Sequence, residues 1–134
     1  MCGIFALFNN LKYSNEVIKM LFLEGKNRGP EDSQFLYLFQ HNMYLGFHRL
    51  AINGYHDKKA NQPFQINNIL LMCNGEIYNH KKLYEFLNIT PKSGSDCEVI
   101  IYCYEKYGME YTLKLLDGVY AFLFFYLNKN KIFE

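Results

Sequence analysis

The second residue of the chain is a cysteine, and its position directly after the start methionine determines what chemistry it could perform. If Met1 is removed, Cys2 carries a thiol and a free α-amine on one residue. An α-amino group titrates near about 7.7 to 8.0, so it can serve as the base that activates the thiol. A buried cysteine in a strand is the structural alternative. Cys2 is therefore a candidate N-terminal nucleophile.

Attack by a thiolate on an amide also needs hydrogen-bond donors for the oxyanion that develops. The segment NGEIYNH at 74–80 supplies two candidates, the side-chain amide of Asn74 and the backbone N–H of Gly75. We expect the strand 69–73 to end here and to deliver both groups at a turn. An ordinary Asn-Gly turn without a catalytic role is the alternative.

An amino-acid substrate would further require a cation for its carboxylate and an anion for its ammonium group. Arg49 lies near the end of the expected strand 42–52, where its guanidinium could bind a carboxylate through two hydrogen bonds. Asp96 stands at the start of an expected helix, where capping is its alternative role.

Composition excludes several classes of protein. The 134 residues fit one domain, and 50% hydrophobic and 18% aromatic residues can form a dense core. The net charge is +1 with scattered basic residues, which argues against nucleic-acid binding. The longest apolar run, at 118–127, is shorter than a membrane helix, and the N-terminus lacks the basic region of a signal peptide, so we expect no membrane partner and a cytoplasmic location.

The four cysteines show no metal-ligand spacing, so we expect no metal site.

Hydrophobic periodicity predicts the elements that must position these residues. Strand patterns come first, helical patterns follow, and strand patterns return. Strands are expected at 2–8, 34–40, 42–52, 69–73 and 118–127, with another beginning at 131 after a turn over NKNK. Helices are expected at 15–26, 79–87, 96–107 and 109–115, the first capped by Ser14. This order favours an α+β fold with antiparallel sheets.

Taken together, seven segments resemble the class II glutamine amidotransferase domain, of the branch found in glutamine-hydrolysing asparagine synthetases. The segments are CGIFALF at the start, RGPED at 28–32, GFHRLAI at 46–52, QPF at 62–64, NGEIYNH at 74–80, SDCEVI at 95–100 and LDGVYAF at 116–122. They follow the family's order and cover almost the whole chain. The resemblance implies one domain over 1–134 with the four-layer αββα fold of N-terminal-nucleophile hydrolases.

The resemblance also implies glutamine hydrolysis to glutamate and ammonia. The implied catalytic residues are Cys2 as nucleophile, with Asn74 and Gly75 as the oxyanion hole. Arg49 is implied to bind the α-carboxylate of glutamine, and Asp96 and Glu76 its α-amino group. No cofactor is implied for this domain, because ATP and Mg²⁺ belong to a synthetase domain that is absent here. A separate synthetase subunit or a homo-oligomer is a possible partner.

The chain departs from the family pattern in one loop and at its end. Asn27 stands where the family has a histidine, and Glu31 is an additional acid before Asp32. The sequence ends at Glu134, within an expected strand, so we expect a two-sheet sandwich that is incomplete at its C-terminus. Three explanations stay open: a truncated remnant, a fragment of a longer product, or a domain that pairs with another chain. Two functions stay open, a glutaminase-type amidotransferase and a non-catalytic glutamine-binding or interaction module.

Overall fold

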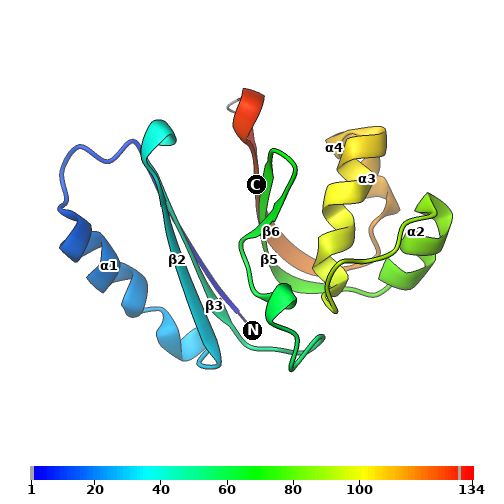
Figure 1. The fold of residues 1–134 in the computed structure, drawn as a ribbon, viewed down its shortest axis with the longest axis horizontal. Coiled ribbons are helices and arrows are strands. Elements are labelled where there is room, and N and C mark those ends of the chain that lie inside the picture. The colour runs from blue at the N-terminus through cyan, green and yellow to red at the C-terminus, as the bar shows by residue number, and fades with distance from the viewer. Residues whose placement is uncertain (1, 130) are drawn as a thin grey trace.

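The computed structural model describes residues 2–129 and 131–134 as two antiparallel sheets that face each other, with helices on both outer surfaces (Figure 1). The first sheet has the order β1-β3-β2 and the second the order β4-β5-β6-β7. The strands are β1 (Gly3–Phe8), β2 (Asp32–Leu38), β3 (Met43–Arg49), β4 (Phe64–Ile66), β5 (Ile69–Ile77), β6 (Gly118–Tyr126) and β7 (Lys131–Phe133). The four-layer α+β prediction is confirmed.

The helices divide unequally between the two outer faces. The first sheet is covered by α1, and the second by α2, α3 and α4 (Figure 1). Their bounds are α1 (Asn15–Leu23), α2 (His80–Leu87), α3 (Val99–Tyr107) and α4 (Met109–Leu115). Short 3-10 helices occupy Lys26–Arg28, Phe39–His41, Lys58–Ala60, Asp96–Glu98 and Leu127–Lys129.

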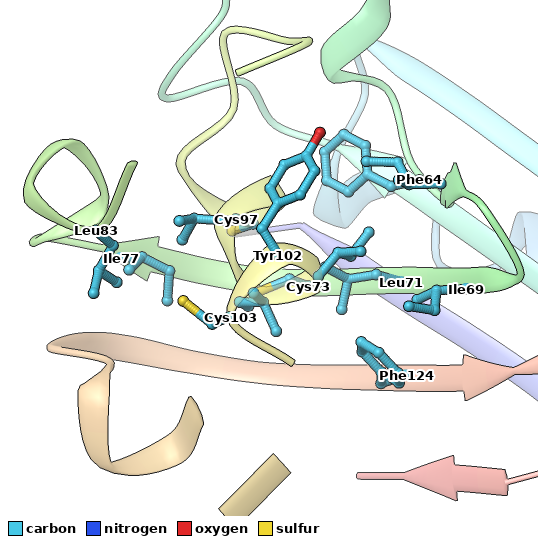
Figure 2. Close-up of a cluster of buried hydrophobic side chains, with 14 of the residues drawn as sticks. Phe64, Ile69, Leu71, Cys73, Ile77, Leu83, Cys97, Tyr102, Cys103 and Phe124 are labelled. Atoms are coloured by element: carbon cyan, nitrogen blue, oxygen red, sulfur yellow. The ribbon is translucent and has the colours of Figure 1, made fainter. Parts of the chain in front are cut away.

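Two hydrophobic clusters hold the layers together. Between the sheets, buried side chains of β3 meet those of β5 and β6; they are Met43, Leu45, Phe47, Leu70, Met72, Leu123 and Phe125. On the other face of β5 and β6, a larger cluster packs against α2, α3 and α4; Figure 2 shows Leu71, Cys73, Ile77, Leu83, Ile69, Cys97, Cys103 and Phe124 among its members. Because strand residues alternate between the two clusters, β5 is buried on both faces.

Helix α1 ends three residues earlier than predicted. Ser14 caps its start as expected, with the hydroxyl accepting a hydrogen bond from Val17 N. At its end, His48 Nε2 donates to the carbonyl of Phe22 over 2.8 Å. The same carbonyl also accepts from Gly25 N at 3.1 Å, a bond of the 3-10 type that tightens the last turn. Gly25 then packs against the His48 ring, and the chain turns into the 3-10 helix Lys26–Arg28.

Strand β5 is longer than predicted, and this corrects the expected turn at Asn74 and Gly75. Both residues lie inside the strand, paired with Ala121 and Tyr120 of β6. A Cβ atom at Gly75 would lie 2.3 Å from the carbonyl oxygen of Val119. Glycine is therefore required by the close approach of two strands, and no turn is formed here.

Three further observations complete the comparison with the expected elements. Strand β4 was missed, because its three residues lie in a segment that read as polar. The expected turn over NKNK falls partly on Asn130, and the expected removal concerns Met1; both residues lie outside the described part of the chain. No helix among the described residues is long and apolar enough to cross a membrane.

Candidate functional site

A cavity of about 200 Å³ opens beside the ends of β1, β3 and β5. All six residues predicted for the site lie in its wall; they are Cys2, Arg49, Asn74, Gly75, Glu76 and Asp96. They come from four separate parts of the sequence, so only the packing of the two sheets brings them together. The volume lies below the roughly 300 to 1,000 Å³ of sites for drug-sized ligands and suits a smaller molecule.

Cys2 precedes β1, and its sulfur faces the backbone of Leu50. Leu50 N lies 3.3 Å from Cys2 Sγ and donates to it, and Leu50 O lies 3.4 Å away as an acceptor. Arg28 Nε donates to the carbonyl oxygen of Cys2 over 3.2 Å. Cys2 remains half-buried. The thiol is therefore both oriented and accessible from the cavity.

Asn74, Gly75 and Glu76 follow one another at the cavity end of β5. Asn74 and Glu76 are half-buried, and Glu76 lies opposite Val119 of β6, another residue of the cavity wall. Alternation along the strand places the side chains of Asn74 and Glu76 on the same face of the sheet. This part of β5 thus offers an amide and a carboxylate next to the thiol of Cys2.

Arg49 is 8% exposed, and its guanidinium bonds the chain's own loop 53–61. Nη1 donates to the side-chain oxygen of Asn61 at 2.7 Å and to the carbonyl of Asp57 at 3.2 Å. Nη2 donates to the carbonyls of Asn53 at 3.2 Å and Gly54 at 2.5 Å. The two terminal nitrogens thus make four hydrogen bonds to this loop. A carboxylate would therefore bind at Nε or take the place of a loop acceptor.

Asp96 is 5% exposed, and its carboxylate accepts two bonds from other elements and a longer one, at 3.7 Å, from Cys97 Sγ to Oδ2. Oδ2 accepts from Ile77 N at 2.6 Å, and Oδ1 accepts from the side-chain amide of Asn53 at 3.1 Å. The first bond ties Asp96 to the end of β5, and the second ties it to the loop that Arg49 holds. The alternative role of Asp96 as a helix cap is not seen: Ser95 is the N-cap of the 3-10 helix Asp96–Glu98, and both oxygens of Asp96 bond other elements.

Three residues that shape the site were not predicted as site residues, although Glu31 was noted as an additional acid. The Glu31 carboxylate accepts a hydrogen bond from Ala51 N, next to the Leu50 contact with Cys2. Asp57 joins two loops, and Glu98 is buried two residues after Asp96. A glutamate directly before the apolar helical run VIIYC was the available signal for Glu98. The contacts of Glu31 and Asp57 join segments far apart in sequence, so no local signal marked them.

Two further thiols lie in the cavity wall, from Cys73 and Cys97, and both are buried. A hydrogen bond with Cys73, together with burial, raises the pKa of Cys97 far above its usual range. A thiol that stays protonated is a poor nucleophile. Among the described residues, no group of three or more His, Cys, Asp or Glu side chains is placed to hold a metal ion.

Comparison with known proteins agrees with this geometry. The family model of the glutamine amidotransferase domain matches residues 1–133. The glutamine-hydrolysing asparagine synthetases of Bos taurus and Homo sapiens are 36% and 35% identical to this chain, and that of Gallus gallus is 36% identical. Each alignment covers 99% of this chain and 24% of the relative, so the chain spans about a quarter of the length of these proteins. The chain belongs to the glutamine amidotransferase domain family.

Proposed function

We propose that this chain hydrolyses L-glutamine to L-glutamate and ammonia through a thioester on Cys2. The observation that carries the proposal is the single cavity whose wall contains a thiol, an amide donor, a guanidinium and two carboxylates. Glutamine presents the complementary groups, namely a side-chain amide, an α-carboxylate and an α-ammonium. Membership of the glutamine amidotransferase family supports the same substrate.

In the proposed mechanism, Met1 is removed and the α-amine of Cys2 takes the thiol proton, directly or through a water molecule. The sulfur then bonds to the side-chain carbonyl carbon of glutamine, and the oxyanion is stabilised by Asn74 and the backbone N–H of Gly75. The C–N bond breaks, and ammonia leaves with the transferred proton. Water finally hydrolyses the thioester to glutamate and regenerates the thiol, so the half-reaction needs no cofactor.

Substrate orientation is assigned to the charged residues of the cavity. The proposal places the α-carboxylate at Arg49 and the α-ammonium between Asp96 and Glu76. Asp96 can accept a further bond at Oδ1, which has two lone-pair sites and accepts only from Asn53, whereas Oδ2 already accepts from Ile77 N and Cys97 Sγ. The relatives are named as asparagine synthetases. We propose that ammonia from this chain is used by a synthetase domain or subunit of that kind, and that ATP and Mg²⁺ would bind there.

A second candidate is a glutamine-binding or interaction module without catalysis. The observation that favours it is the set of four hydrogen bonds between Arg49 and loop 53–61, because these bonds occupy the group proposed for the substrate carboxylate. In this case the carboxylate of glutamine would replace one loop acceptor at Arg49, so glutamine would bind but would not be hydrolysed.

The deciding experiment measures glutamate and ammonia release from glutamine by the purified chain, with Cys2→Ala as the control. Mass spectrometry of the intact chain first establishes that Met1 is absent. Release that disappears in Cys2→Ala supports the enzyme. A folded chain without Met1 that binds glutamine but releases no ammonia supports the module and overturns the hydrolytic proposal.

A further inference from the structure

We infer that Glu98 is the positioning residue that fixes Asp96 for the substrate ammonium, a role that rests on the proposed function. Glu98 is 1% exposed and lies two residues after Asp96, and it is not among the residues that line the cavity. A carboxylate this deeply buried is costly unless it is fully hydrogen-bonded. The groups that donate hydrogen bonds to Glu98 therefore indicate which part of the structure it holds in place.

Three of the four hydrogen bonds to the Glu98 carboxylate come from the loop that leads into Asp96. Oε1 accepts from Lys92 N at 2.8 Å, and Oε2 accepts from Ser93 N at 2.8 Å and from the Ser93 hydroxyl. The fourth donor is the hydroxyl of Tyr102, at 2.8 Å from Oε1. Figure 2 shows this hydroxyl pointing out of the hydrophobic cluster. Glu98 thus anchors the loop 92–95 to the start of α3.

The anchored loop continues the bonding toward Asp96. The Ser93 hydroxyl that donates to Glu98 also accepts from Ser95 N at 3.2 Å, and the Ser95 hydroxyl accepts from Cys97 N at 3.3 Å. Asp96 lies in the sequence between Ser95 and Cys97, which this last bond joins. Its own side chain is directed by Ile77 N, but its backbone is held by the loop that Glu98 anchors. Loss of the anchor would therefore move or loosen the Asp96 carboxylate.

The variant Glu98→Gln tests this role because the two backbone donors cannot change direction. Lys92 N faces one carboxylate oxygen and Ser93 N faces the other. In either orientation, the amide of glutamine turns an NH₂ group toward one of these N–H donors, so one bond is lost. Tyr102→Phe is the matched control, because it removes one bond to the same carboxylate and leaves both loop bonds intact.

Hydrogen exchange followed by mass spectrometry measures the structural part of the inference without any substrate. We expect Glu98→Gln to increase exchange in 92–96 by roughly tenfold, the effect of losing a bond to a charged group. Exchange within α3 should remain at the wild-type rate, and Tyr102→Phe should leave 92–96 protected. Unchanged protection of 92–96 in a folded Glu98→Gln chain would overturn the inference. Uniformly faster exchange in both segments would overturn it as well, because it would indicate general destabilisation.

Calorimetric binding measures the functional part, in a Cys2→Ala background that prevents turnover. We expect Glu98→Gln to weaken L-glutamine binding by roughly tenfold. Binding of 5-amino-5-oxopentanoate, which is glutamine without its α-amino group, should change less than twofold. An equal loss for both ligands would overturn the link to the ammonium. If the parent chain binds no glutamine, the proposed function fails, and the exchange comparison still decides whether Glu98 positions Asp96.

Discussion

The sulfur of Cys2 and the backbone of Leu50 face each other at the edge of the first sheet, with Sγ 3.3 Å from Leu50 N and 3.4 Å from Leu50 O. Leu50 directly follows β3, whose residue His48 pairs with Gly3 of β1. The pairing of two neighbouring strands therefore sets the position of the thiol. Loop 53–61 begins only three residues later. Thiol and guanidinium are thus positioned by the same short segment.

Cys2 is expected to be the reactive cysteine of the chain. Cys73, Cys97 and Cys103 are buried, and burial raises the pKa of Cys103 to about 11. At pH 8 this lowers the thiolate fraction of Cys103 by roughly two hundredfold relative to an ordinary thiol with a pKa of about 8.5. Limited alkylation with iodoacetamide, followed by peptide mass spectrometry, should modify Cys2 first. Faster modification of Cys97 or Cys103 would contradict the burial described here.

Replacement of Arg49 by lysine is expected to loosen loop 53–61. Lysine has one nitrogen and cannot reproduce the four hydrogen bonds made by two guanidinium nitrogens. Trypsin cleavage after Lys58 and Lys59 should become at least about tenfold faster, because bonds to a charged donor contribute about 1.5 to 3 kcal/mol each. Cleavage after Lys106 in α3 provides the internal reference. Equal rates in the variant and the wild type would show that Arg49 does not hold the loop.

Gly75→Ala is expected to destabilise the chain by about 1 to 3 kcal/mol, the usual cost of overpacking. The added methyl would lie 2.3 Å from the carbonyl oxygen of Val119, so the strands must separate. Urea unfolding followed by circular dichroism measures the change. Ala121→Gly in the facing strand is the control, with an expected cost of about 0.5 to 1 kcal/mol. A Gly75→Ala chain as stable as the control would show that the strands yield without cost.

The bond between Asp57 and Gly94 is expected to make stability depend on pH. Hydrogen bonds from the backbone of Gly94 and then of Lys59 hold the pKa of Asp57 below its usual range. Because the folded-state pKa is lowered, the stabilisation is present above the unfolded value of about 3.9 and is lost as pH falls further. The melting temperature of Asp57→Asn should therefore be below that of the wild type at pH 6.

Melting temperatures of the wild type and Asp57→Asn at low pH test whether the stabilisation by Asp57 is lost as the pH falls. The difference between wild type and Asp57→Asn should shrink as the pH falls below about 4, because Asp57 of the unfolded chain binds its proton first and Asp57 of the folded chain only at lower pH. A difference that stays constant over this range would mean that the asparagine side chain acts through packing and that the charge of Asp57 contributes nothing.

The sequence alone predicted the elements well where local pattern decides them. The apolar runs of β1 and β6 and the bounds of α4 were predicted almost to the residue. Helix α1 was predicted too long; at its end the carbonyl of Phe22 accepts from Gly25 N and from His48, and the contact with this distant strand is not visible in local sequence. The Asn74-Gly75 pair was expected at a turn, because the close approach of Val119 that requires glycine is not visible in local sequence.

The sequence by itself determined which residues could form the site, since motif order and residue type marked Cys2, Arg49, Asn74 and Asp96. Tertiary structure alone decided that these residues share one cavity and that the guanidinium of Arg49 is bonded to its own loop. It also directed the buried Glu98 carboxylate to the backbone of Lys92 and Ser93. The physical reason is that side-chain hydrogen bonds depend on the direction of donors from distant segments, and this direction is fixed only when the two sheets pack together.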